Sequence, residues 1–363
     1  MSAPSPEEIS AAMAISSTHR MRGLKDGIGF PTTAEAMAAV YAASALPPEP
    51  APFGPVPLGP AIGAIAPHDD FLYAGRVLRR ALERIEANTV VIVGTFHRYR
   101  DFPAMFGSFD SRESWWSPDG AVPVSPLREA AIAHMKPWPT PVNDAAHDQE
   151  HSIEPIVAWL RHENPELEIL PILPPGGYID VLCTSGWLLG TALRKAMQES
   201  GLEMGRDVAV VISADAIHYG EDFGQTRYGP GGIHAHDKAV SDDKRFLRQY
   251  FSGAVTSSGL LDFFNELVEE RDPHRYRWAW CGRFAIPFGI SMLEGLTEGG
   301  RIMGWPLAYE TSMSAPPLDV AMPPLGFTGP ASYEHFVGYP AVAFTFDPSK
   351  GAGEIRLADR PKS

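Results

Sequence analysis

Hydrophobic and polar positions alternate along this chain in two distinct patterns. The first is a short, unbroken run of apolar residues rich in Val and Ile, which is typical of a strand buried on both faces of a sheet. Two further apolar runs near the end of the chain have the character of closing strands. The predicted strands are residues 61–66, 89–94, 167–173, 207–213, 303–311 and 341–346.

The second pattern places apolar residues three and four positions apart, which indicates amphipathic helices. These helices are expected at residues 33–43, 75–87, 151–162, 181–200, 235–251, 258–270 and 285–298. Strands and helices therefore alternate over most of the chain. This order predicts an α/β fold with three αβα layers around a central mixed, mostly parallel sheet.

One Pro-rich segment interrupts the pattern, at residues 46–60 (LPPEPAPFGPVPLGP). It cannot form a helix, and too little chain precedes it to form a separate domain. We therefore interpret it as a strap across the surface. The predicted organisation is a flexible N-terminus (1–20), a single α/β domain (21–350) and a C-terminal tail (351–363).

Composition narrows the functional classes. Hydrophobic residues make up 44% of the 363 positions, enough for a sizeable core. The formal charge of −14 argues against a nucleic-acid partner, because such a surface repels phosphates. Only two cysteines are present, which is typical of a reducing compartment. Neither a signal peptide nor an eighteen-residue apolar run is evident, so we expect a cytoplasmic protein with no membrane partner.

Polar residues gather directly after three of the predicted strands. His68, Asp69 and Asp70 follow the first strand, and His97 follows the second. The strand at 207–213 leads into Asp215 and His218. In open α/β sheets, binding sites form just beyond the carboxyl ends of the strands. The pattern therefore predicts a functional site at this edge of the sheet.

Each of these residues also has a structural interpretation. His68 and His97 could be loop or cap residues, and Asp215 could cap a following helix. His151 and Glu154 are three positions apart, so they could share a pocket or form a surface pair. Cys281 could be a packing residue. At the start of a predicted helix, however, the helix dipole would favour its thiolate, the form that binds metals.

Six segments together resemble the Memo family, which includes the bacterial proteins called AmmeMemoRadiSam system protein B. Their order along the chain agrees with that of the family from about residue 20 to about residue 345. The segments are IAPHDDFLYAG, VVIVGTFHRY, WWSPDGAVPV, EHSIEPIVAWL, SADAIHYG and CGRFAIPFGIS.

The resemblance implies a fold like that of the class III extradiol dioxygenases, which use non-haem iron(II). It implies a metal site formed by His68, His97 and Cys281. Three further residues, His218, Asp215 and His151, are implied as catalytic residues of the pocket. Two departures from the family pattern add charge beside the metal: Asp69-Asp70 replaces Ala-Gly, and Arg98 replaces the second of two adjacent histidines.

The expected function is that of a dioxygenase-like oxidoreductase that acts on a small chelating organic substrate with O2. Fe(II) is the expected metal, and Cu or Zn would also suit two nitrogens and one sulfur. One alternative is a zinc-dependent hydrolase in which Asp69 or Asp70 is the general base. Another is a metal-binding or interaction protein that catalyses no reaction.

Overall fold

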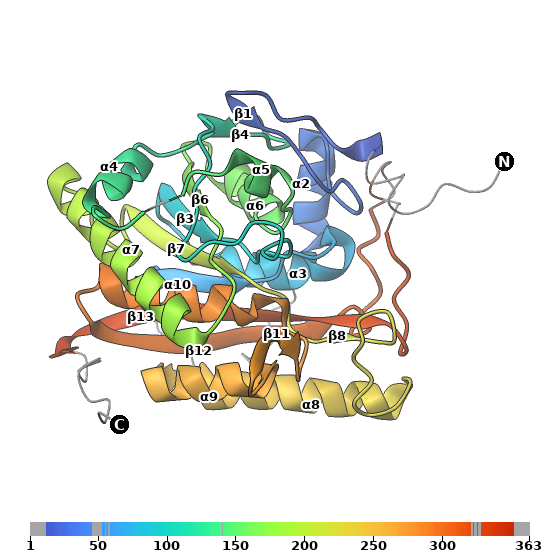
Figure 1. Ribbon diagram of the computed structural model, residues 1–363. Helices are drawn as coiled ribbons and strands as arrows, with labels where there is room; N and C mark the ends of the chain where they lie inside the picture. Colours follow the sequence, from blue (N-terminus) through green and yellow to red (C-terminus); the bar gives the residue numbers. More distant parts are fainter. Residues whose placement is uncertain are drawn as a thin grey trace, which may run out of the picture.

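A computed structural model describes most of the chain (Figure 1). The described residues are 12–45, 53–54, 56, 59–139, 141–320, 322, 325 and 328–351, with side chains to residue 347. Most of the Pro-rich segment lies outside these ranges, as do residues 1–11 and the tail from residue 352 onward. The surface strap and the division into N-terminus, domain and tail therefore stay predictions.

An eight-stranded mixed sheet forms the centre of the molecule, with the order β6-β3-β7-β2-β13-β12-β9 and β8 paired to β13. The four strands from β6 to β2 run parallel, and the remaining pairs are antiparallel. The sheet is thus mixed, as predicted, but antiparallel strand pairs make up a larger share of it than expected. The strands are β6 (Glu168–Ile172), β3 (Thr89–Val93), β7 (Val208–Ser213), β2 (Gly63–Ala66), β13 (Phe336–Gly351), β12 (Gly300–Thr311), β9 (Gly253–Ala254) and β8 (His218–Tyr219).

The parallel strands form the buried centre of the fold. Residues of β2, β3 and β7 are buried along their whole length, which explains their unbroken apolar sequences. In the register, Val93 lies beside Ile212, and Ala66 lies beside Ser213. The carboxyl ends of β3, β7 and β2 therefore meet at one edge of the sheet, where the polar residues follow.

Helices pack on both sides of the sheet, which confirms the three-layer prediction (Figure 1). Helix α3 packs on β2, β12 and β13 and contacts α2 and α6, whereas α10 packs on β7 and against α7. The helices are α2 (Ala34–Ala43), α3 (Phe71–Leu82), α4 (Leu127–His134), α5 (Asp144–Asp148), α6 (Glu154–Glu163), α7 (Ile179–Ser200), α8 (Ile233–Tyr250), α9 (Ser257–Leu267) and α10 (Ala285–Leu296).

Several short elements were not predicted from the sequence. They comprise α4, α5, β8, β9, β1 (Met21–Arg22), β4 (Ser114–Trp115), β5 (Val122–Pro123), β10 (Val268–Glu269), β11 (Asp272–Tyr276) and the 3-10 turn η1 (Cys281–Arg283). Within the described ranges, no helix combines the length and apolar character needed to cross a membrane.

Helix α3 starts four residues before the predicted position, because Asp70 caps it. The Asp70 carboxylate accepts a hydrogen bond of 2.8 Å from the backbone N–H of Leu72. An N-cap of this kind satisfies a free N–H of the first turn and fixes where the helix begins. As a result, His68 and Asp69 lie in a short segment between β2 and α3.

Candidate metal centre

His68 lies two residues beyond β2 and is held from behind by Ser213, the last residue of β7. The Ser213 hydroxyl lies 2.7 Å from Nδ1 of His68 and donates its hydrogen to the carbonyl of Ser152 at 2.6 Å. Because the hydroxyl has one hydrogen, it must accept from the N–H at His68 Nδ1. Nε2 of His68 therefore carries the lone pair. Burial lowers the pKa of His68 well below its usual value, so the ring is neutral.

His97 follows β3 and is held by the buried carboxylate of Glu150. Nδ1 of His97 lies 2.9 Å from Oε1 of Glu150, and its backbone N–H donates to Oε2 at 2.7 Å. Burial disfavours a charged imidazole, but the Glu150 carboxylate outweighs it and raises the pKa of His97. A carboxylate on Nδ1 is the usual partner of a metal-binding histidine, because it leaves Nε2 free to coordinate.

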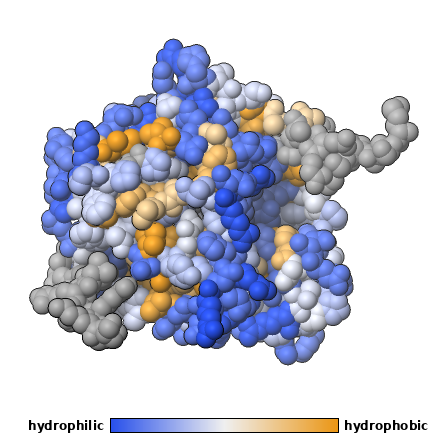
Figure 2. All heavy atoms as spheres, viewed as in Figure 1, coloured by the Kyte–Doolittle hydropathy of each residue, from blue (hydrophilic) through white to orange (hydrophobic). Residues whose placement is uncertain are grey.

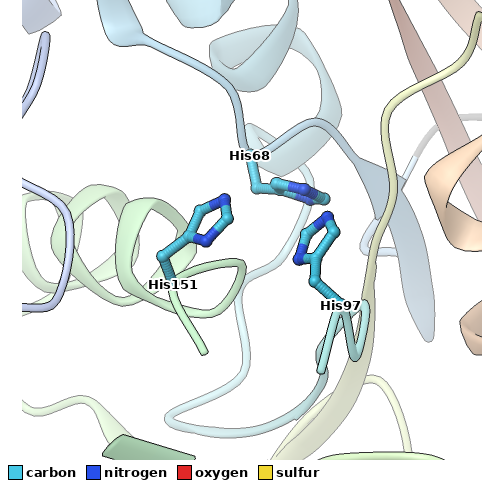
Figure 3. Close-up of side chains that lie close together, drawn as sticks. All are labelled: His68, His97 and His151. Carbon is cyan, nitrogen blue, oxygen red and sulfur yellow. The ribbon is translucent and has the colours of Figure 1, made fainter. Parts of the chain in front are cut away.

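His151 completes a group of three imidazoles (Figure 3). Its ring stacks on that of His97, with centroids 4.8 Å apart and planes 7° apart. One ring nitrogen from each of His68, His97 and His151 lies within 4.8 Å of the others. The side chains of His97 and His151 are 35% and 36% exposed, against 3% for His68. The group therefore has a buried end at His68 and an accessible end at the other two rings.

Cys281 lies on the buried side of His68, in the 3-10 turn that precedes α10. Its Sγ is 3.8 Å from Nε2 of His68 and accepts a 3.0 Å hydrogen bond from the backbone N–H of Asp215. Burial, with the nearby Asp215 carboxyl, raises the pKa of the Cys281 thiol well above its usual value. Desolvation therefore opposes the thiolate that the start of the helix was expected to favour. A bound cation would reverse this balance.

Asp215 is buried and caps no helix, since β8 follows it. Its Oδ1 accepts from the backbone N–H of His68 at 3.0 Å, and its Oδ2 lies 3.3 Å from Nε2 of the same ring. Burial and the neighbouring Asp69 raise the pKa of Asp215 well above its usual value. Its geometry thus suits it to position His68.

Two overlapping sets of possible ligands result. His68 belongs to both: one set adds His97 and His151, and the other adds Asp215 and Cys281. His97 and Cys281, both expected as ligands, fall in different sets. The donors nevertheless fit a transition metal, because Nε2 of His68 and Nε2 of His97 each carry a lone pair when the rings are neutral. Which third donor joins them stays a prediction.

A cavity of about 260 Å³ opens beside this centre. His68, His151, His218 and Asp69 are among the residues that line it. Nδ1 of His218 lies 3.1 Å from the carbonyl of Ala216, which can only accept, so Nδ1 carries the proton and Nε2 the lone pair. Burial lowers the pKa of His218, which keeps the ring neutral. His218 thus has the form of a general base at the cavity wall.

The two carboxylates that distinguish this chain from the family pattern have different surroundings. Asp69 lines the cavity and accepts a 2.6 Å hydrogen bond from the Tyr339 hydroxyl. Asp70 caps α3, and burial raises its pKa to about 7. Both side chains line the cavity, but the Asp70 carboxyl is engaged as the helix cap, so Asp69 is the one available to a bound molecule.

Sequence reasoning missed two residues that support the centre, Glu150 and Ser213. Glu150 accepts from His97 and from the backbone N–H groups of His151 and Ser152. A signal was present, because Glu150 directly precedes the predicted pocket residue His151. Ser213 gave little signal, since a serine at a strand end has many ordinary roles.

Comparison with known proteins places most of the chain in one group. A family profile described as Memo-like protein matches residues 46–315, a range that contains every residue of the metal centre and cavity named in this section except Tyr339. A MEMO1 family protein from Pyrococcus furiosus is 26% identical over 261 residues, 69% of this chain and 81% of the relative. One from Thermococcus kodakarensis is 28% identical over 259 residues, again 69% and 81%. One from Pyrobaculum aerophilum is 32% identical over 168 residues, 44% and 54%.

Proposed function

The chain belongs to the Memo family, and on this basis we propose that it is a metal-dependent, dioxygenase-like oxidoreductase acting on a small chelating organic substrate with O2. The observation that carries the proposal is the pair of oriented imidazoles. Ser213 and Glu150 hold Nδ1 of His68 and His97, so both Nε2 atoms are available to one ion. Cys281 or His151 supplies the third donor.

Three protein ligands leave coordination positions open, and a bound Fe(II) would supply redox chemistry and hold a chelating substrate beside O2. The chain's own residues would do the rest. The cavity of about 260 Å³ admits a small molecule next to His68 and His151. His218 would take a proton from a substrate hydroxyl at Nε2 and return it later, while its Nδ1–H stays bonded to the carbonyl of Ala216.

One observation favours a second candidate, a zinc-dependent hydrolase. Asp69 is a carboxylate at the cavity wall, and it accepts a hydrogen bond from the Tyr339 hydroxyl, which holds the side chain in place. A carboxylate so placed could serve as general base for a water molecule. The metal decides between the two candidates: zinc with no redox response supports hydrolysis, and iron or copper supports the oxidoreductase.

The test begins with the metal content of anaerobically purified protein and of four variants. We expect His68→Ala to lose most of its bound metal while keeping the fold. Loss in Cys281→Ser with retention in His151→Ala identifies the thiolate as the third ligand, and the reverse identifies the imidazole. Cys183→Ser is the matched control, because Cys183 lies in α7 away from the centre. Stoichiometric metal in His68→Ala would refute the site.

Oxygen uptake with catechols and other chelating acids then tests the reaction. The wild-type protein should consume O2 with at least one such substrate. His218→Ala should keep its metal and lose at least about 100-fold in rate, the usual contribution of a general base. If His218→Ala abolishes metal binding, the assigned role is wrong. If loaded wild-type protein consumes no O2 with any of them, the oxidoreductase proposal fails.

A further inference from the structure

A second, larger cavity lies away from the metal centre, alongside helices α7 and α10. Its volume is about 600 Å³, within the range of small-molecule binding sites. We call it the α7–α10 cavity. The starts of α9 and β12 close its other sides. Hydrophobic side chains lie at the surface on this side of the molecule, over α7 and α10 (Figure 2).

Aromatic side chains form the walls of this cavity. Trp138 and Trp187 both line it and are 50% and 46% exposed, unusually high values for tryptophan. Phe106 lies beside Trp138, with ring centroids 5.9 Å apart. Exposed aromatic faces of this kind bind apolar groups and, through their negative electrostatic potential, organic cations.

Glu294 supplies the charge that selects between these ligands. It lines the cavity from α10 and forms no ion pair or side-chain hydrogen bond with any residue that the structure describes. Burial alone raises its pKa, to about 7. A carboxylate without a partner in an apolar setting is unfavourable, and a cation placed beside it relieves that cost. A second acid, Asp180, also lines the cavity, against one basic residue, Arg301.

We propose that the α7–α10 cavity binds an organic ammonium ion, with its apolar body against Trp138 and Trp187 and its nitrogen paired with the Glu294 carboxylate. The aromatic walls accept both parts of such a molecule, and the carboxylate discriminates against anions and favours the cation over a neutral analogue. The site is separate from the metal centre, so the proposal does not depend on the proposed function.

The test uses three eight-carbon probes that differ only in charge: octylamine, octanol and octanoate. Binding is measured by calorimetry at about pH 8, where Glu294 is ionised, and by tryptophan fluorescence. We expect octylamine to bind at least about tenfold more tightly than octanol, as a charge-assisted contact and a cation–π contact would give. Octanoate should bind more weakly than octanol.

Two variants and a control assign the effect. Glu294→Gln should remove the preference for the amine over the alcohol, whereas Glu199→Gln, an exposed acid of α7, should preserve it. Thr184→Arg places a competing cation at an exposed position of the cavity wall and should also weaken amine binding. The proposal is overturned if the three probes bind equally, if none binds, or if Glu294→Gln retains the preference.

Discussion

At the scale of single residues, Glu150 controls the geometry of two imidazoles at once. Its carboxylate accepts from the ring and backbone of His97 and from the backbone of His151. Burial favours the protonated form of Glu150, but the charge of His97 and its hydrogen bond outweigh burial and lower the pKa of Glu150. Glu150 is therefore ionised at neutral pH. The Glu150 side chain thus positions both His97 and His151, the two rings at the accessible end of the metal centre.

We expect Glu150→Gln to weaken metal binding by about 10- to 100-fold, because the amide orients His97 less well and carries no charge. The dissociation constant of the metal, measured by competition with a chelator, checks this. Glu113→Gln, an exposed acid on the surface, is the control and should leave affinity unchanged. Equal affinity in the wild type and in Glu150→Gln would contradict the role given to this carboxylate.

Glu294 gives a pH-dependent prediction at the same scale. Its pKa is raised by burial from 4.5 to about 7, so the folded protein holds this proton to a higher pH than the unfolded chain does. The stabilisation of the folded state that results from this raised pKa is fully present below pH 4.5, and it is lost as the pH rises through 7.

We therefore expect the free energy of unfolding of the wild type, relative to that of Glu294→Gln, to fall by roughly 2 kcal/mol between about pH 4.5 and pH 7. This is less than the full linkage value, because the side chain is partly solvated. Urea denaturation at several pH values measures this. A difference that is constant with pH would show that Glu294 titrates normally.

The histidines of the site could be predicted from sequence because they are rare and follow apolar strands directly. His68, His97 and His218 all lie beside or within the cavity region where the pattern indicated a site. Which side chains hold them could not be predicted. The hydroxyl of Ser213 reaches His68 across 145 positions, and such a contact depends on the register of β7 against β2.

At the scale of elements, α7 and α10 pack unusually closely through glycines of α7. A Cβ atom added at Gly186 would lie 2.2 Å from the carbonyl oxygen of Phe288, and one at Gly190 would lie 2.1 Å from that of Met292. Backbone carbonyls cannot move aside as a flexible side chain can. The two helices can therefore approach this closely only where α7 carries no side chain.

We expect Gly190→Ala to lower the free energy of unfolding by roughly 2 kcal/mol, even though alanine favours a helix by about 1 kcal/mol over glycine. Chemical denaturation measures the change. Gln198→Ala, at an exposed position of the same helix, should change stability by less than about 0.5 kcal/mol. A stabilised Gly190→Ala protein would mean that the helices are free to separate.

The long elements were predictable and the short ones were not, for a physical reason. Strands such as β3 and helices such as α7 bury enough apolar surface to impose a period on the sequence. Two-residue strands such as β8 have no period, and their pairing depends on distant partners, as when His218 lies opposite Val337. The start of α3 was missed because its cap, Asp70, was interpreted as part of the site.

At the scale of the whole molecule, the metal centre joins segments that are far apart in the chain. His68 and His97 follow β2 and β3, His151 precedes α6, and Cys281 lies in the turn before α10. An ion bound there would stabilise the folded state only, because the unfolded chain does not hold these groups together.

Removal of the metal by a chelator should therefore lower the Tm by several degrees, since an ion at 1,000 times its Kd contributes about 4 kcal/mol. Differential scanning calorimetry with and without chelator measures this. His68→Ala should be insensitive to the chelator. A wild-type Tm that does not change on verified metal removal would place the ion outside the folded core.

The difference in exposure across the three imidazoles has a kinetic consequence. Because His151 and His97 are more exposed than His68, an ion arriving from solvent would meet these two rings first and would reach Nε2 of His68 only after shedding more of its water. Capture would then proceed in two phases, a fast collision complex and a slower dehydration step. Release would follow the reverse order, so that the residence time of the ion is set by the most deeply enclosed ring.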